Sequence, residues 1–269
     1  MRFPKVRLVG ISVNLVTKNQ LLDFFQTSIE HQSKVVVGAH NMHSVYLAQR
    51  DKSIREFYEV CDLAYVDGMP LVWMAEALDL PISSEHRVAF LDWYDDFFRM
   101  AAANKWRLFY LGGAAESSKN FEKVLHDRYP GLQACVHHGY VRDYDVETLC
   151  KQINKFKPHA VFVGMGMPIQ EKFIVDAVPY LKTSLIFAGG AMLEYLTGEE
   201  RAAPRWMGPL GLEWLYRLVH SPKRLAYRYL VEPTKIFPLF VRELFQDRDY
   251  LGKRFMGKPE EALVCKADK

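Results

Sequence analysis

Residues 63–78, LAYVDGMPLVWMAEAL, contain the pattern that decides the fold of this chain. A short apolar run rich in β-branched and aromatic residues ends at Asp67, Gly68 follows, and a second apolar run begins at once. The pattern predicts a buried strand, a turn and a helix. Asp-Gly is a common turn dipeptide, which favours a turn role for Asp67. Its apolar flanks would also withdraw the carboxylate from water and raise its pKa toward the range of a general base.

The same succession of strand, polar or glycine loop and helix recurs along the chain. It appears at residues 34–49, 106–130, 159–178 and 184–198, and residues 132–141 add a further strand-like run. Strands that alternate with helices form βαβ units, and continuous apolar strands are typical of a sheet covered on both faces. We therefore predict an α/β fold with a mainly parallel, Rossmann-like sheet and helices on both faces. The loops after its strands would converge on one crevice.

The composition is that of a soluble globular protein, since 49% of the 269 residues are hydrophobic and 25% are charged. Four scattered cysteines without a C-x-x-C pair favour a reducing, cytosolic setting and argue against a cysteine-ligated zinc site. No uncharged apolar run approaches the roughly 18 residues of a membrane-spanning helix. We expect a soluble or peripheral protein.

The pattern changes after Gly198. Five prolines interrupt residues 201–245, which contain no strand-like run and are predicted to form broken helices. We place a domain boundary near residue 200, between an α/β domain (1–200) and a basic, aromatic-rich helical appendage (201–269). Residues 201–254 carry eleven Lys or Arg against five acidic residues, while the whole chain has a net charge of +3. Such a basic excess indicates an anionic partner.

Three arginines of the appendage, Arg217, Arg224 and Arg228, would share one face of a continuous helix. Aromatic and leucine residues are interleaved with them, as in amphipathic segments that lie on an anionic membrane surface. The alternative is a helix that packs on the domain and leaves its charges in solvent. No base-reading motif is present, so we expect no nucleic acid partner. Self-association often covers an apolar arm that has no membrane to contact, and would give a homo-oligomer.

Glycine loops follow several of the predicted strands. GMGMPIQ (164–170) invites comparison with a dinucleotide fingerprint, but Ile169 stands at the third glycine position and no acidic residue ends the next strand. We therefore expect no nicotinamide or flavin, and no D-x-D, H-E-x-x-H or P-loop motif implies a metal or another cofactor. The glycines that could present backbone N–H groups to a phosphate are Gly112, Gly113, Gly164 and Gly190. The alternative is that they only permit close packing or tight turns.

Two polar side chains stand in comparable loops. Gln170 would hydrogen-bond a nucleotide or a sugar hydroxyl, or would be a solvent-facing residue at the start of a helix. Asn41 is a natural N-cap for the helix that follows it, and a capping residue can also contact a ligand.

At these residues the chain resembles the WecG/TagA/CpsF family of bacterial glycosyltransferases, glycosyltransferase family 26. The similarity extends from about Val35 to about Leu230 and is strongest in DLAYVDGMPLVW, HRVAFLD, VFVGMGMPIQEKFI and RAAPRWMGPLGLEWLYRLVHSPKRLAYRYL. The resemblance implies an inverting transfer of a hexose from a UDP-sugar to an undecaprenyl-diphosphate-linked sugar. The hexose would be of the N-acetylmannosamine, N-acetylmannosaminuronic acid or glucose type. The reaction would take place at the inner face of the cell membrane, in cell-surface polysaccharide biosynthesis.

The family's functional residues match positions in this chain one by one. The resemblance implies that Asp67 is the general base for the acceptor hydroxyl and that Asn41 contacts the sugar or the nucleotide. The other implied contacts are Arg87, Gln170, Arg217, Arg224 and Arg228, the last three to a membrane or a diphosphate. Many members carry a threonine where this chain has Ala39, so a hydroxyl contact to the donor is missing or replaced. With no metal motif, arginines and helix N-termini would stabilise the departing UDP.

A different class of protein would share many of these features. A non-catalytic α/β module that binds a nucleotide-sugar or a membrane needs the same fold and the same basic appendage. Replacing Asp67 with Asn separates the two hypotheses. A base role requires turnover to collapse while UDP binding persists, whereas a turn role predicts lost stability and little kinetic effect.

Overall fold

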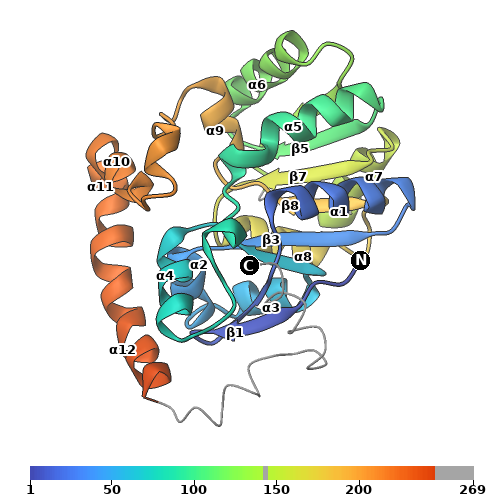
Figure 1. The fold of residues 1–269 in the computed structure, drawn as a ribbon. Coiled ribbons are helices and arrows are strands. Elements are labelled where there is room, and N and C mark those ends of the chain that lie inside the picture. The colour runs from blue at the N-terminus through green and yellow to red at the C-terminus, as the bar shows by residue number, and fades with distance from the viewer. Residues whose placement is uncertain (142–144, 246–269) are drawn as a thin grey trace.

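A six-stranded parallel sheet forms the centre of the computed structural model, which describes residues 1–141 and 145–245 (Figure 1). Its strands lie in the order β4-β3-β8-β7-β5-β6. Their bounds are β3 (Val35–His40), β4 (Leu63–Val66), β5 (Arg107–Gly112), β6 (Gln133–His137), β7 (Ala160–Gly164) and β8 (Leu185–Ala188). The predicted α/β fold with a parallel sheet is confirmed.

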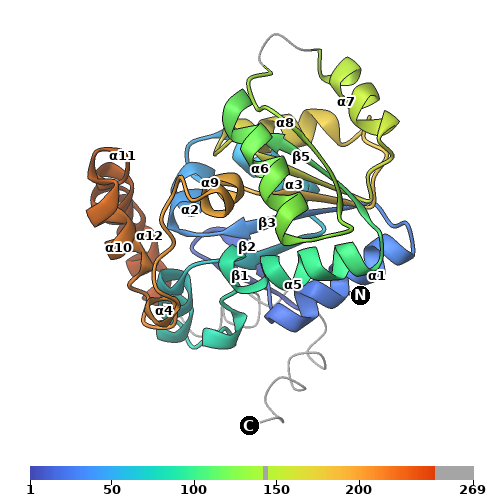
Figure 2. The ribbon, with the colours of Figure 1, turned by 90° about the horizontal axis from the view of Figure 1, so that it is seen from above.

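Helices cover both faces of this sheet (Figure 2). One face is packed by α1 (Lys18–Glu30), α5 (Phe90–Ala103) and α6 (Ala115–Arg128), and the other by α3 (Lys52–Val60), α7 (Val146–Lys155) and α8 (Ile169–Ala177). Successive strand residues point to opposite faces, so Phe162 joins the first apolar cluster while Val161 and Val163 join the second. Burial on both faces explains why the strands are continuous apolar runs.

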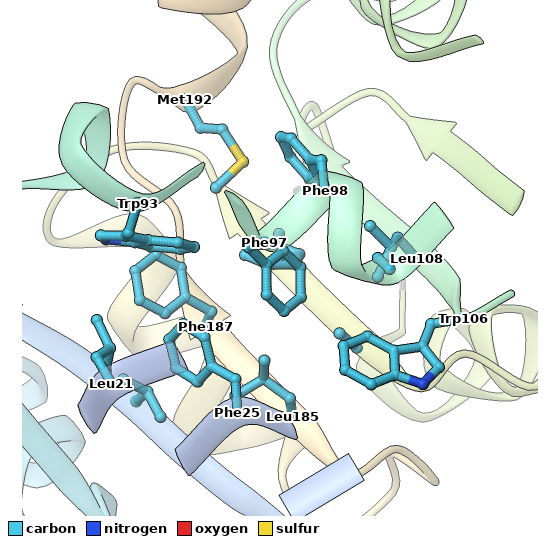
Figure 3. Close-up of a cluster of buried hydrophobic side chains, with 14 of the residues drawn as sticks. Leu21, Phe25, Trp93, Phe97, Phe98, Trp106, Leu108, Leu185, Phe187 and Met192 are labelled. Carbon is cyan, nitrogen blue, oxygen red and sulfur yellow. The ribbon is translucent and has the colours of Figure 1, made fainter. Parts of the chain in front are cut away.

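Aromatic rings fill the layer between the sheet and helices α1 and α5 (Figure 3). Phe25 of α1 meets Trp93 of α5 edge to face at a centroid distance of 5.2 Å, and Trp93 meets Phe187 of β8 at 5.1 Å. Such pairs contribute about 1 kcal/mol each beyond the burial of their apolar area. This aromatic packing therefore fixes the position of α5 relative to β8, near the carboxyl edge of the sheet.

An N-terminal hairpin packs beside β4. The elements of this part are β1 (Lys5–Leu8), β2 (Ile11–Asn14), α2 (Met42–Ala48) and α4 (Met69–Ala77). Val9 and Gly10 at the hairpin turn have φ angles of 48° and 77°, the left-handed pair that a type I′ turn requires. Asn14 accepts a hydrogen bond from the Ala64 amide at 2.9 Å through its side-chain oxygen, which joins the hairpin to β4.

The chain leaves the sheet after α9 (Met192–Thr197) and forms no strand between residues 201 and 245. We call residues 201–245 the arm, whose helices stand along one side of the domain in Figure 1. Its segments are a 3-10 turn at Arg205–Met207, α10 (Glu213–His220), α11 (Pro222–Ala226), a π-helical turn at Tyr227–Val231, and α12 (Glu232–Leu244). The arm is not one continuous helix, because Pro222 disfavours helical backbone at Ser221, where φ is −137° and ψ is 56°.

The arm also shares apolar packing with the domain. Ile236 of α12 is fully buried in the cluster formed by the hairpin, α2 and α4. At the end of α12 the Glu243 carboxylate accepts the backbone N–H groups of Val9 and Gly10 at 3.0 and 3.2 Å. The division near residue 200 therefore marks a change in structural pattern, and its interpretation as a domain boundary stays a prediction. Residues 246–269 of the predicted appendage lie outside the described residues.

Candidate active site

The order of the strands creates a crevice at the carboxyl edge of the sheet. Strand β3, the first of the parallel sheet, lies between β4 and β8, so the chain turns in opposite directions on its two sides. A cavity of about 780 Å³ opens there, at the kind of switch point where α/β proteins bind ligands. Its lining comes from the loops after β3, β4, β7 and β8 and, on the opposite side, from the arm.

Asn41 and Asp67 meet at this edge because their strands pair in register. His40 is opposite Val66, so the next residues of both strands are neighbours. The Asn41 side-chain oxygen accepts the N–H of Ser44 and caps α2, while its Nδ2 donates to Asp67 Oδ2 at 3.3 Å. Both Asn41 and Asp67 line the cavity. Asn41 thus serves as the predicted cap and at the same time orients the carboxylate.

The electrostatic surroundings of Asp67 suit proton transfer. Burial raises the pKa of Asp67, against the opposing positive charge of Arg87 and the hydrogen bond from Asn41. A carboxylate with a raised pKa accepts a proton from a hydroxyl more readily than an exposed one. Gly68, which directly follows Asp67, is the N-cap of α4, and both residues line the cavity. The turn from β4 into α4 therefore also places the carboxylate at the cavity.

Arg87 lies beside this pair but does not line the cavity. Its side chain is only 6% exposed and pairs with Asp92 Oδ2 at 2.9 Å and with Glu213 Oε2 at 2.8 Å. Arg205 pairs with the same two carboxylates, at 3.5 Å in the case of Glu213. We call Arg87, Asp92, Arg205 and Glu213 the ion ring. It connects the domain to the arm, so Arg87 is engaged as a clamp between them.

Three of the four singled-out glycines serve packing. A Cβ on Gly112 would overlap the Gly164 carbonyl, a Cβ on Gly164 would overlap the Tyr110 hydroxyl, and a Cβ on Gly113 would meet Leu193. None of the three lines the cavity, and the closeness of their neighbours accounts for the missing side chains. Gly190, by contrast, does line the cavity.

Gln170 lines the cavity as well, and its polar atoms are engaged within the protein. Its Oε1 accepts the N–H groups of Gly166 at 3.2 Å and Gly190 at 3.1 Å, and its Nε2 donates to Glu171 at 2.7 Å. The residue is buried, which excludes the solvent-facing alternative. The structure therefore places Gln170 where it shapes the cavity wall.

The arm brings three arginines to the same cavity, namely Arg217, Arg224 and Arg228. Arg217 is 20% exposed and has its Nε 3.8 Å from a Glu200 carboxylate oxygen, and Arg224 pairs with the same carboxylate. Burial, and then the neighbouring charge of Arg217, lower the pKa of Arg228. Glu194, Glu213 and Glu232 also line the cavity. The three guanidinium groups, which lie together on the arm, are of the kind that bind a diphosphate.

Several further residues of the cavity were not predicted from the sequence. Tyr195 lies with its ring centroid 5.7 Å from the Arg217 guanidinium, and burial raises its pKa to about 12. Trp214 and Tyr229 of the arm also line the cavity, with their rings 6.1 Å apart. Glu171 is fully buried beneath it. The one feature of the sequence that could have indicated Glu171 is its position directly after Gln170, at the start of a helix with a buried face.

Two further properties concern ions and membranes. Within residues 1–141 and 145–245, no three His, Cys, Asp or Glu side chains gather as a metal site would require. No helix in the same part of the chain combines the length and apolar composition needed to cross a bilayer.

Comparisons with known proteins identify the family of this chain. The model of the glycosyl transferase WecG/TagA/CpsF family matches residues 6–250. Proteins of Staphylococcus aureus strains MRSA252 and NCTC 8325 are each 29% identical over 251 residues, which cover 93% of this chain and 95% of theirs. Both are named N-acetylglucosaminyldiphosphoundecaprenol N-acetyl-beta-D-mannosaminyltransferase. The chain belongs to the WecG/TagA/CpsF family of glycosyltransferases.

Proposed function

We propose that this protein is an inverting glycosyltransferase that moves a hexose from a UDP-sugar to an undecaprenyl-diphosphate-linked sugar during the synthesis of a cell-surface polysaccharide. The hexose is of the N-acetylmannosamine, N-acetylmannosaminuronic acid or glucose type. Membership of the family supports the sugar transfer. The names of the Staphylococcus relatives specify an undecaprenyl-diphosphate-linked acceptor and a β-D-mannosaminyl group, which supports the acceptor. Inversion at an α-linked UDP-sugar would give this β configuration.

One observation carries the proposal: the cavity has a carboxylate on one wall and arginines on the other. Asp67, whose pKa is raised by burial, lies at the end of β4. Arg217 and Arg228 face the same cavity from the arm. A sugar transfer from a nucleoside diphosphate needs a base near the acceptor hydroxyl and positive charge near the departing diphosphate. A module that only binds a nucleotide-sugar would not need the base.

The chemistry is a single displacement. Asp67 takes the proton of the acceptor hydroxyl while that oxygen forms a bond to the anomeric carbon of the donor. The bond from the anomeric carbon to the diphosphate oxygen breaks, and its electron pair leaves with UDP. Attack from the face opposite the leaving group inverts the anomeric configuration. Asn41 holds the carboxylate in place through its hydrogen bond of 3.3 Å.

Arginines stabilise the leaving group in this proposal without a divalent ion. Arg217 and Arg228 each have a buried Nε without a hydrogen-bond partner among the described residues. Guanidinium groups bind diphosphate oxygens with two parallel hydrogen bonds and stabilise the charge that develops on them. Arg224 completes this wall beside Glu200. We assign these arginines to the diphosphate rather than to a membrane because they face the cavity.

The exposed residues of the arm suit the anionic inner surface of the bacterial cell membrane. Large apolar side chains are exposed on the arm at Trp206, Leu210, Leu215, Val219, Leu230 and Phe237. Lys223 and Arg242 are exposed on the same segment. Apolar side chains with flanking cations hold a peripheral protein at an anionic surface. We expect binding to vesicles with anionic lipid and not to zwitterionic vesicles. Equal binding to both would contradict a contribution of the basic side chains to membrane binding.

A donor panel tests the reaction. UDP-N-acetylmannosamine, its uronic acid, UDP-glucose and UDP-galactose are each incubated with a polyprenyl-diphosphate-linked sugar, and UDP release is measured. We expect release with one of the first three that depends on the acceptor. If UDP binds but no donor reacts with any acceptor of this class, the alternative of a non-catalytic module that binds a nucleotide-sugar or a membrane is favoured.

A further inference from the structure

A buried acid beside Gln170 has no role in the proposed reaction. Glu171 is fully buried in the first turn of α8. Its Oε1 accepts a hydrogen bond from Gln170 Nε2 at 2.7 Å, and its Oε2 has no hydrogen-bond partner among the described residues. Burying a carboxyl group without a cation beside it is costly, so its presence beneath the cavity needs a reason.

The amide that Glu171 holds joins two loops of the cavity. Gln170 Oε1 accepts the N–H of Gly166, in the loop after β7, and the N–H of Gly190, in the loop after β8. Both glycines line the cavity, and their φ angles of 76° and 54° lie in the left-handed region. One oxygen atom therefore sets the spacing of two loops that border the site.

This arrangement works in one orientation of the amide only. If the Gln170 amide turned over, its NH₂ group would face two backbone N–H donors, and three donors would lose their acceptor. Glu171 Oε1 accepts from the NH₂ group and thereby selects the productive orientation. The Tyr58 hydroxyl does not compete with Gln170 for Glu171 Oε1, because this hydroxyl donates its hydrogen bond to the Ala39 carbonyl at 2.7 Å.

The arrangement does not depend on the charge of Glu171. Burial raises the pKa of Glu171 to about 7, although the hydrogen bond from Gln170 opposes the shift. A neutral carboxylic acid still accepts a hydrogen bond through its carbonyl oxygen. The acid can therefore hold the amide on both sides of neutral pH.

We propose that Glu171 is a positioning residue, which orients the Gln170 amide so that this amide holds the β7 and β8 loops in the geometry of the cavity that takes the UDP-sugar donor. The ligand in this statement rests on the proposed function. The positioning of the loops does not, so the two parts are tested by different measurements.

Three variants and a matched control separate the roles. Glu171→Met removes the acceptor but keeps a long, flexible side chain that fills the space. Glu171→Gln keeps an acceptor oxygen and removes the charge, and Gln170→Ala removes the clamp. The control is Asp176→Asn, an acidic residue of the same helix that pairs with Lys172 at 2.7 Å and is half exposed.

The first measurement is amide hydrogen exchange at Gly166 and Gly190 by NMR, which needs no ligand. The second is calorimetric titration with UDP. We expect Glu171→Met to speed exchange at both glycines and to weaken UDP binding, each by about tenfold. Glu171→Gln and Asp176→Asn should remain close to the parent protein. In combination with Gln170→Ala, Glu171→Met should have no further effect, because both act through one amide.

Other results would overturn the proposal. Weaker UDP binding with unchanged glycine exchange would mean that Glu171 contacts the ligand itself, and additive effects of the two substitutions would mean that it acts independently of Gln170. The side-chain amide protons of Gln170 in the unaltered protein provide a reading without any substitution, since fast exchange of both would contradict the hydrogen bond. If UDP fails to bind the parent protein while exchange responds as expected, the donor assignment fails and the positioning role stands.

Discussion

The α/β domain and the arm bring opposite charges to one cavity and hold them in different ways. On the domain side, Asp67 sits at the end of a strand whose register with its neighbour places Asn41 within hydrogen-bond distance. On the arm side, Arg217 and Arg228 sit on short helical segments separated by a break at Ser221. The carboxylate is thus fixed by the pairing of two parallel strands. The guanidinium groups lie on helical segments outside the sheet and are held by side-chain contacts, such as those of Arg217 and Arg224 with Glu200.

The ion ring makes the two walls depend on each other. Glu213 begins α10, and through Arg87 it is tied to the loop that precedes α5. Arg87 also lowers the pKa of Asp67 against the effect of burial. From the arm, Glu213 raises the pKa of Asp67 and Arg217 lowers it. The docking of the arm therefore sets where the arginines lie and also contributes to the proton affinity of the base. Because Asp67 is held by the sheet and the arginines are held by the docked arm, we expect substitutions in the domain and in the arm to have different consequences.

The largest effect is expected on the domain wall, from Asp67→Asn. The substitution keeps the shape and the turn but removes the proton acceptor, so kcat should fall by a factor of about 100 to 10,000. UDP affinity, measured by calorimetry, should stay within about twofold, because binding relies on the arginines. Asp96→Asn on the exposed side of α5 is the control, with unchanged kcat. Residual activity near that of the parent protein would remove Asp67 from the mechanism.

The next effect is expected on the arm wall, from Arg217→Gln or Arg228→Gln. Each substitution removes positive charge that stabilises the departing diphosphate, so kcat/KM should fall about a hundredfold and UDP affinity should fall with it. Arg99→Gln, on the surface of α5, serves as the matched control. Lower vesicle binding with unchanged kcat/KM would instead assign these arginines to the membrane.

A smaller effect is expected where the two walls are tied together. Glu213→Gln leaves the buried Arg87 with one carboxylate fewer, and the free energy of unfolding should fall by about 2 kcal/mol. Hydrogen exchange in α10 should rise more than exchange in the sheet. Glu147→Gln in an exposed pair of α7 is the control, with a change within about 0.5 kcal/mol. Uniform destabilisation of domain and arm would contradict a local clamp.

The smallest effect is a shift in the pH dependence of the base. Burial raises the pKa of Asp67 above its ordinary value of 3.8, and the charge of Arg217 opposes this rise. Asp67 must be ionised to accept a proton, so kcat/KM should increase with pH through its pKa. In Arg217→Gln the opposing charge is lost, the pKa rises further, and the acidic limb of the profile should move to higher pH. Arg99→Gln should leave the limb in place, and a shift to lower pH in Arg217→Gln would contradict the coupling.

The sequence predicted the positions of residues at the strand ends better than their partners. Asn41 and Asp67 were expected at one crevice because they follow strands of a parallel sheet, and the structure places both in the lining of the cavity. Gln170 was found too, but its hydrogen bonds to Gly166 and Gly190 depend on the spacing of two loops. Gly112 and Gly164 looked like phosphate-binding positions, and only the closeness of their two strands revealed that they pack against each other.

The periodicity of apolar residues determined the α/β fold, the order of the elements and the loops that border the crevice, because strands and helices leave local repeats in a sequence. Tertiary structure alone decided that Arg87 clamps the arm, that the arginines of the arm turn to the cavity, and that Glu171 lies beneath it. Arg87 and Glu213 are 126 positions apart, and no local repeat records a contact over that distance. Such contacts arise only when the whole chain has packed, since burial and charge pairing then select among the many partners each side chain has.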